Sequence, residues 1–185
     1  MRAAEILGRQ VIIEGFKNVK VEKTDVFLDL VRERTKDCHI QFFDAEMIAG
    51  FDHLYFAVLN ALKAFDAGIN ISGKVDVETL LYASGQHQIS RAIELLGIKP
   101  DSSEIAVLII ADSERRATEA LNVVLELLQG DRSDEVIEMT DEKTGTIKAA
   151  FGITNLEIEA MMRKSEKEAL TSLLIERAAL LATQS

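Results

Sequence analysis

Residues 104–111 have the sequence E-I-A-V-L-I-I-A, and Ile105–Ala111 is the longest uninterrupted apolar run in the chain. Seven apolar residues have the length of a buried β-strand and fall far short of the roughly 20 that a membrane-spanning helix needs. Asp112 or Ser113 follows at once and can cap a helix that continues to about Leu128. The stretch therefore predicts a buried strand followed by a helix.

Upstream of this run the sequence predicts three more strands. Gln10–Phe16 and Val19–Val21 are expected to be strands joined by a short turn, and Cys38–Phe43 forms another. Between and after them lie segments with helical spacing, glycine stops and capping-box starts: 24–35, 51–67, 76–84, 86–96, 113–128, and helices that start at Thr154 and Ser165. In the segment 24–35, Val26, Phe27, Leu30 and Val31 fall on one face.

Early strands, one late strand and many helices predict an α/β protein of the α+β type, with a small mixed sheet flanked by about seven helices. A length of 185 residues suits one domain, spanning 1–185, in which 154–185 forms a C-terminal helical part. Cys38 is the single cysteine, which excludes an intramolecular disulfide and a thiolate zinc cluster. No metal or cofactor is expected, and we predict a cytoplasmic protein that does not enter the membrane.

The net charge of −10 repels nucleic acid as a whole and argues against a DNA partner. The charge is uneven, because residues 1–100 contain 12 Lys and Arg against 14 Asp and Glu, whereas residues 101–185 contain 9 against 17. Any contact with phosphate should therefore use the N-terminal half.

Residues Gly68–Lys74 match G-x-x-x-x-G-K, the skeleton of a phosphate-binding P-loop. The motif needs a strand before the loop, but a helix is predicted there, and Val75 replaces the Ser or Thr that would bind magnesium. We therefore interpret the segment as a helix stop followed by a turn, and reject nucleotide binding.

The histidines are His39, His53 and His87, and no pair has metal-ligand spacing. No acid–base pair can be selected by spacing, so no catalytic residue is predicted. An enzyme stays open as an alternative if His53 and His87 converge in one small-molecule pocket.

The segment Glu78–Ile93, E-T-L-L-Y-A-S-G-Q-H-Q-I-S-R-A-I, is the most distinctive in the chain. Two helices meet at one glycine, and Gln86, His87 and Gln88 are expected to form the first turn of the second helix, where free N–H groups could bind phosphate. Lys63 and Lys74 are cations nearby in sequence, and Tyr82 offers a ring on which a base could stack. The alternative is an ordinary helical corner with solvated polar residues.

The last helix has an apolar stripe with apolar flanks. The stripe consists of Leu170, Leu174, Ala178 and Leu181, and Leu173, Ile175 and Leu180 lie beside it. Such a stripe usually faces the core, but a helix that is apolar on more than one side requires something to cover it, which favours a partner. A self-associating structural protein, in which this helix pairs with its own copy, is the second alternative.

At these residues the sequence resembles the kinase-binding subunit of the KEOPS tRNA-modification complex, the family of the PRPK-binding protein. The resemblance is best over Asp44–Ile110, and rests on F-D-H-L-Y-F-A-V-L-N-A-L-K-A-F, on E-x-L-x-x-x-S-G-x-x-Q-I-x-x-A-I and on the strand that follows. It implies a non-catalytic protein that binds and activates the complex's small atypical kinase. It also implies recruitment of tRNA by its CCA end for threonylcarbamoyladenosine formation.

The resemblance places Ser84, Gln86, Gln88 and Ile89 at the RNA-facing corner, and His87 lies among them in sequence. It assigns Leu170, Leu173, Leu174 and Leu181 to the kinase-binding face or to the core beneath it. Members of the family often have Arg where this chain has His87. Because a histidine near neutrality is mostly uncharged, affinity for RNA should be weaker or more dependent on pH.

Overall fold

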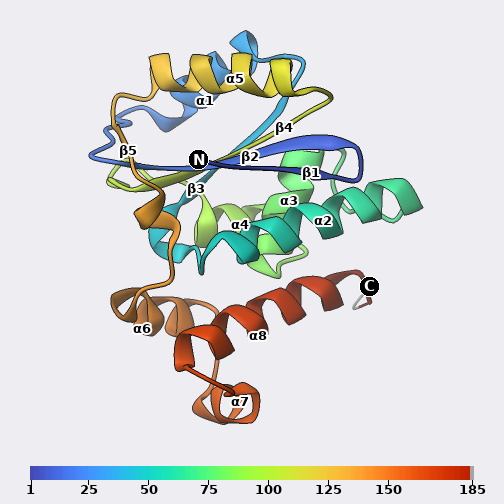
Figure 1. The fold of residues 1–185 in the computed structure, drawn as a ribbon, viewed down its shortest axis with the longest axis vertical. Coiled ribbons are helices and arrows are strands. Elements are labelled where there is room, and N and C mark those ends of the chain that lie inside the picture. Colours follow the sequence, from blue (N-terminus) through green and yellow to red (C-terminus); the bar gives the residue numbers. More distant parts are fainter. Residues whose placement is uncertain (184–185) are drawn as a thin grey trace. The chain divides into compact units, whose positions relative to one another are not determined.

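The computed structural model describes residues 1–183 of the chain, which form two compact units. The first unit consists of residues 1–45 and 97–136, and the second consists of residues 46–96 together with those from 137 onward. Each unit therefore combines two segments that are distant in the sequence (Figure 1).

The first unit is built on a sheet with the strand order β1-β2-β4-β3, in which β5 also pairs with β2. Its strands are β1 (Arg2–Ile6), β2 (Arg9–Lys17), β3 (His39–Asp44), β4 (Ile105–Ala111) and β5 (Asp131–Arg132). Ile109 of β4 pairs with Ile12 on one side and Ile40 on the other. All of these pairings are antiparallel, so the α+β class is confirmed but the expectation of a mixed sheet was wrong.

The first strand was missed at the sequence level. Its residues, R-A-A-E-I, include one β-branched side chain, Ile6, and no aromatic one, so they carry little of the signal that marks strands. A tight turn at Leu7 and Gly8, both with positive φ, pairs β1 with β2. Val19 and Val21, expected in a strand, are instead buried in the segment between β2 and α1 (Thr24–Arg34).

Two helices, α1 and α5 (Glu114–Leu127), cover one face of the sheet (Figure 1). The Phe27 ring of α1 meets the Phe42 ring of β3 edge-on, with centroids 5.1 Å apart. Val31 is buried in the same core, but Val26 and Leu30 are 63% and 40% exposed. The predicted apolar face of α1 therefore reduces to Phe27 and Val31, which point at the sheet.

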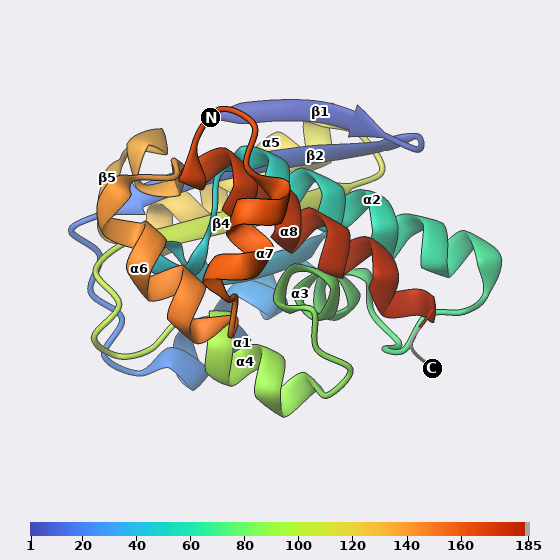
Figure 2. The same cartoon turned by 90° about the horizontal axis from the view of Figure 1, so that it is seen from below.

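The second unit is helical among its described residues. It contains α2 (Phe51–Ala67), α3 (Val75–Ser84), α4 (Ile89–Leu96), α6 (Asp141–Ala150), α7 (Asn155–Met161) and α8 (Glu166–Leu180), with short 3-10 turns at Ala45–Met47, Asp134–Ile137 and Leu181–Thr183 next to or within it. Helix α8 packs on α2, α3, α6 and α7, so the C-terminal part shares a core with the 46–96 segment (Figure 2).

Local capping explains several helix boundaries. Gly68 and Gly85, both left-handed, end α2 and α3, and the Ser113, Thr154 and Ser165 side chains cap α5, α7 and α8 as their spacing predicts. Thr154 and Glu157 form a complete capping box. Within residues 1–183, no helix is both long enough and apolar enough to cross a bilayer.

Candidate functional site

The corner between α3 and α4 is shaped by its backbone. The Gly85 N–H donates to the Tyr82 carbonyl and the Gln86 N–H to the Leu81 carbonyl, which is the Schellman pattern. Gly85 has φ +62°, a conformation that side chains disfavour. Helix α4 begins only at Ile89, so the prediction that Gln86, His87 and Gln88 form its first turn was wrong, and the Gln86 N–H is already engaged.

Two of the predicted RNA-binding side chains are buried. Tyr82 is 3% exposed and Ser84 is 1% exposed, and the Ser84 hydroxyl donates to the Leu81 carbonyl. Burial raises the pKa of the Tyr82 phenol, and the nearby Glu78 charge adds to the effect. Neither side chain is placed for direct contact, because α3 is buried on all sides from Glu78 to Ser84, and the ring of Tyr82 is not free to stack on a base.

The remaining side chains of the corner are accessible. His87, Gln88 and Ile89 are exposed, and Gln86 is partly exposed. Ile89 and Ile93 are 44% and 52% exposed and lie one turn apart on the same side of α4. The corner therefore presents two amides, an imidazole and an apolar pair.

The two predicted lysines lie away from this corner. Lys74 precedes α3, a helix of ten residues and thus about 15 Å long, whereas the corner follows its other end. His53 of α2 bonds the carbonyl of Ala83 at the corner end of α3, and Lys63 lies ten residues, again about 15 Å, further along α2. Both lysines are exposed, but they belong to the opposite end of the α2–α3 pair.

His53 is a structural residue. Its ring is fully buried, Nε2 lies 2.8 Å from the Ala83 carbonyl oxygen, and Nδ1 accepts the Ala49 N–H at 3.2 Å. Burial lowers the pKa of His53 to about 4, although the bond to Ala83 opposes the shift. Because His53 is enclosed while His87 is exposed, the two imidazoles do not line a common pocket, and that enzyme alternative loses its basis. The described residues contain no cluster of three or more His, Cys, Asp or Glu suited to a metal.

The P-loop-like segment is occupied by a side chain of the protein itself. The carboxylate of Glu78, 0% exposed, accepts the N–H groups of Ile71 and Ser72 at 2.6–3.1 Å. In a P-loop such groups would bind phosphate, and α2 rather than a strand precedes the segment. The segment is therefore a helix stop at Gly68 followed by a turn that Glu78 holds, as interpreted from the sequence.

The four leucines predicted as a partner interface are core residues. Leu170, Leu173, Leu174 and Leu181 are 0%, 9%, 2% and 1% exposed. The first three pack with Ile147, Ile153 and Ile158 of the second unit. Of the two expectations, a kinase-binding face or the core beneath it, their burial agrees with the core, because α2, α6 and α7 cover α8 on several sides. The exposed apolar side chains of this region are Leu156, Met162 and Leu180.

Arg177 of α8 was not anticipated from the sequence. Its guanidinium donates to the Phe151 carbonyl at 2.6 Å and to the Glu157 carboxylate at 2.8 Å. The pKa of Glu157 falls to about 2, because the Thr154 N–H, then Arg177 and the Thr154 hydroxyl donate to its carboxylate. The Cβ of Arg177 is 4.0 Å from the position of a Cβ on Gly85, so α8 packs against the corner.

The comparisons with known proteins agree on one family. The family model described as "Kinase binding protein CGI-121" matches residues 16–182. The "Regulatory protein Cgi121" of Methanocaldococcus jannaschii is similar to this chain, with 28% identity over 143 residues that cover 77% of this chain and 85% of the relative.

Proposed function

Because the chain belongs to the CGI-121 family of kinase-binding proteins, we propose that it is a non-catalytic, cytoplasmic accessory subunit of the KEOPS complex that binds and activates the complex's small atypical kinase. The proposal rests on the family match, which runs through residues of both compact units and is therefore more than a shared helical motif. The similarity to a protein named as regulatory supports the same role.

We assign the kinase contact to side chains that remain exposed on the C-terminal helices. Leu156, Met162 and Leu180 are 77%, 48% and 44% exposed, whereas the neighbouring leucines are in the core. Large apolar side chains on the surface are what a protein partner can cover, and these three are the exposed ones on the C-terminal helices. The buried leucines then act indirectly, because they hold α7 and α8 in place.

Activation of the kinase is tested by its ATP turnover. The purified kinase should hydrolyse ATP several-fold faster when this chain is added, and the rate should saturate at equimolar protein. If the chain binds the kinase but ATP turnover is unchanged, the protein binds the kinase without activating it. Absence of both effects would refute the proposal.

We further propose that the α3–α4 corner binds the single-stranded 3′ end of tRNA. Gln86 and Gln88 provide amides that can both donate to and accept from base edges, and Ile89 provides apolar contact. The buried side chains of Tyr82 and Ser84 support the corner from inside the second unit. Lys63 and Lys74 lie too far along the helices to contact the nucleotides that the corner binds. With His87 in place of an arginine, we expect weak binding.

The tRNA part is tested with tRNA that carries or lacks CCA. Binding should fall several-fold when CCA is removed, and a Gln86→Ala, Gln88→Ala variant should bind both forms alike. Equal binding of both tRNA forms by the unmodified protein would remove this proposal and leave the kinase role untouched.

A further inference from the structure

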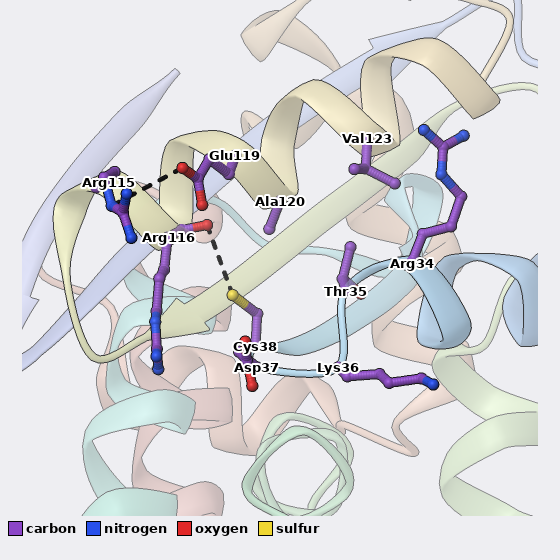
Figure 3. A pocket seen from close by; sticks show the side chains of 10 residues that line it. All are labelled: Arg34, Thr35, Lys36, Asp37, Cys38, Arg115, Arg116, Glu119, Ala120 and Val123. Atoms are coloured by element: carbon purple, nitrogen blue, oxygen red, sulfur yellow. Dashed lines mark hydrogen bonds and ion pairs between the residues drawn. The ribbon is translucent and has the colours of Figure 1, made fainter.

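The first compact unit contains a pocket outside both surfaces assigned above. It lies between the first half of α5 and the segment that links α1 to β3, and its volume is about 190 Å³. In Figure 3, Arg115 and Arg116 lie on one side, Arg34 and Lys36 on the other, and Cys38 between them. The Cys38 thiol donates to the Arg116 carbonyl at 3.6 Å, which ties the two walls together.

The pocket has an excess of positive charge in an acidic protein. Four cationic and two anionic side chains line it, although the chain as a whole has a net charge of −10. Glu119 and Asp37 are the anionic pair. This local excess is what an anionic ligand requires.

Three of the four cations are available to a ligand. Arg34 is engaged by Glu126 through two hydrogen bonds of 3.1 and 2.6 Å. Arg116 and Arg115 make only long ion pairs, at 3.5 Å to Asp112 and 3.8 Å to Glu119, between exposed groups. Ion pairs between exposed groups are weak, so a phosphate could displace them. Lys36 is exposed on the opposite wall.

We propose that this pocket binds the phosphoryl group of a phosphorylated serine or threonine on a protein partner. Sites for drug-sized ligands have volumes of about 300–1,000 Å³. The pocket is smaller than this, and its volume suits the end of one side chain. A phosphomonoester has a charge near −2 and three acceptor oxygens, toward which the long, exposed side chains of Arg116 and Lys36 on the two walls would turn. The inference rests on the proposed function for its partner, since a kinase is a direct source of phosphorylated side chains.

An RNA backbone fits the pocket less well. A phosphodiester has a single charge and two free oxygens, and its binding grows with a continuous track of cations. The surrounding surface includes Asp112, Glu114 and Glu126, all exposed, which would repel neighbouring phosphates. A single phosphomonoester brings no further phosphates against these carboxylates.

A peptide titration tests the chemistry. The acetylated, amidated peptide Gly-Ala-pThr-Ala-Gly should shift the amide signals of residues 35–38 and 115–119 in the ¹H–¹⁵N spectrum, and the unphosphorylated peptide should not. A Lys36→Ala, Arg116→Ala variant should bind at least tenfold more weakly, whereas Arg32→Ala, an exposed cation of α1 outside the pocket, should bind as the unmodified protein does. The assignment to a protein segment would be overturned if inorganic phosphate binds as tightly as the peptide. It would also be overturned if a short single-stranded RNA displaces the peptide.

The kinase itself separates this inference from the proposed function. Kinase incubated with ATP should bind the unmodified chain at least fivefold more tightly than phosphatase-treated kinase, and the difference should vanish in the Lys36→Ala, Arg116→Ala variant. Equal affinity of the two kinase forms would overturn the phosphate site but retain kinase binding. Failure of both forms to bind would refute the proposed function.

Discussion

The Nε2 atom of His53 on α2 lies 2.8 Å from the carbonyl oxygen of Ala83, two residues before the glycine that turns the chain from α3 into α4. Because Nδ1 accepts the Ala49 N–H, the ring is neutral and its proton is on Nε2, which donates to Ala83. The edge of the Phe151 ring packs near the same imidazole. One buried side chain thus holds the start of α2 to the corner.

This arrangement predicts a loss of stability in acid. The pKa of His53 is about 4 in the folded protein and near 6.5 when unfolded, so between these values the unfolded chain binds the extra proton. The stabilisation is complete above pH 6.5 and is lost as pH falls toward 4. We expect the free energy of unfolding to be about 2 kcal/mol lower at pH 5 than at pH 7 from this residue alone. Urea titrations of the protein and of His53→Gln measure it, and identical pH dependence in both would contradict the assignment.

Leu174 and Leu180 distinguish core from surface on the same helix. Leu174 is 2% exposed and Leu180 is 44% exposed. Leu174→Ala should lower the free energy of unfolding by about 2–5 kcal/mol, because it leaves a cavity among α8 and its neighbours. Leu180→Ala should change it by less than about 0.5 kcal/mol. Chemical denaturation of both variants provides the comparison, and similar costs would mean that α8 is packed differently.

Glu78 is expected to hold the loop between α2 and α3. Glu78→Ala removes the acceptor for the Ile71 and Ser72 N–H groups, and should cost about 1–3 kcal/mol. Hydrogen exchange at these two amides should accelerate more than elsewhere in the unit. Glu94→Ala, at an exposed position on α4, is the control and should leave both amides protected. Unchanged protection in Glu78→Ala would refute the role.

Gly85 and Gly73 form a matched pair for the corner. Gly85 has φ +62°, so Gly85→Ala should cost about 1–2 kcal/mol and distort the turn that presents Gln86 and Gln88. Gly73 has no such conformation and no atom within 4 Å of a new Cβ, so Gly73→Ala should be close to neutral. We expect weaker binding of the tRNA 3′ end in the first variant alone. If both variants bind the tRNA 3′ end equally well, the corner does not take part in RNA recognition.

Features set by local chemistry were accessible from the sequence. Glycine stops at Gly68 and Gly85, the capping box at Thr154 and the apolar run Ile105–Ala111 each depend on residues within a few positions, and the structure confirms these elements. The family resemblance was likewise confirmed, because it rested on a specific pattern around Ser84 and Gly85.

Features set by packing between distant segments could not be predicted from the sequence. The sequence showed that Leu170 and Leu174 form a stripe, but not that residues 46–67 and 137–161 cover it. Tyr82 was predicted as a stacking ring, but the structure buries it at the C-terminal end of α3. Arg177 gave no signal, since its partners at Phe151 and Glu157 are 26 and 20 residues away.

The proposed binding of the KEOPS kinase is tested most directly by calorimetric titration of the two purified proteins. We predict saturable binding with a stoichiometry of one to one, weakened at least tenfold by Leu156→Glu together with Leu180→Glu, and unaffected by Val26→Glu on α1, which introduces the same charge at an exposed position of the first unit. An absence of binding heat at several temperatures, with separate elution of the two proteins, would contradict the account.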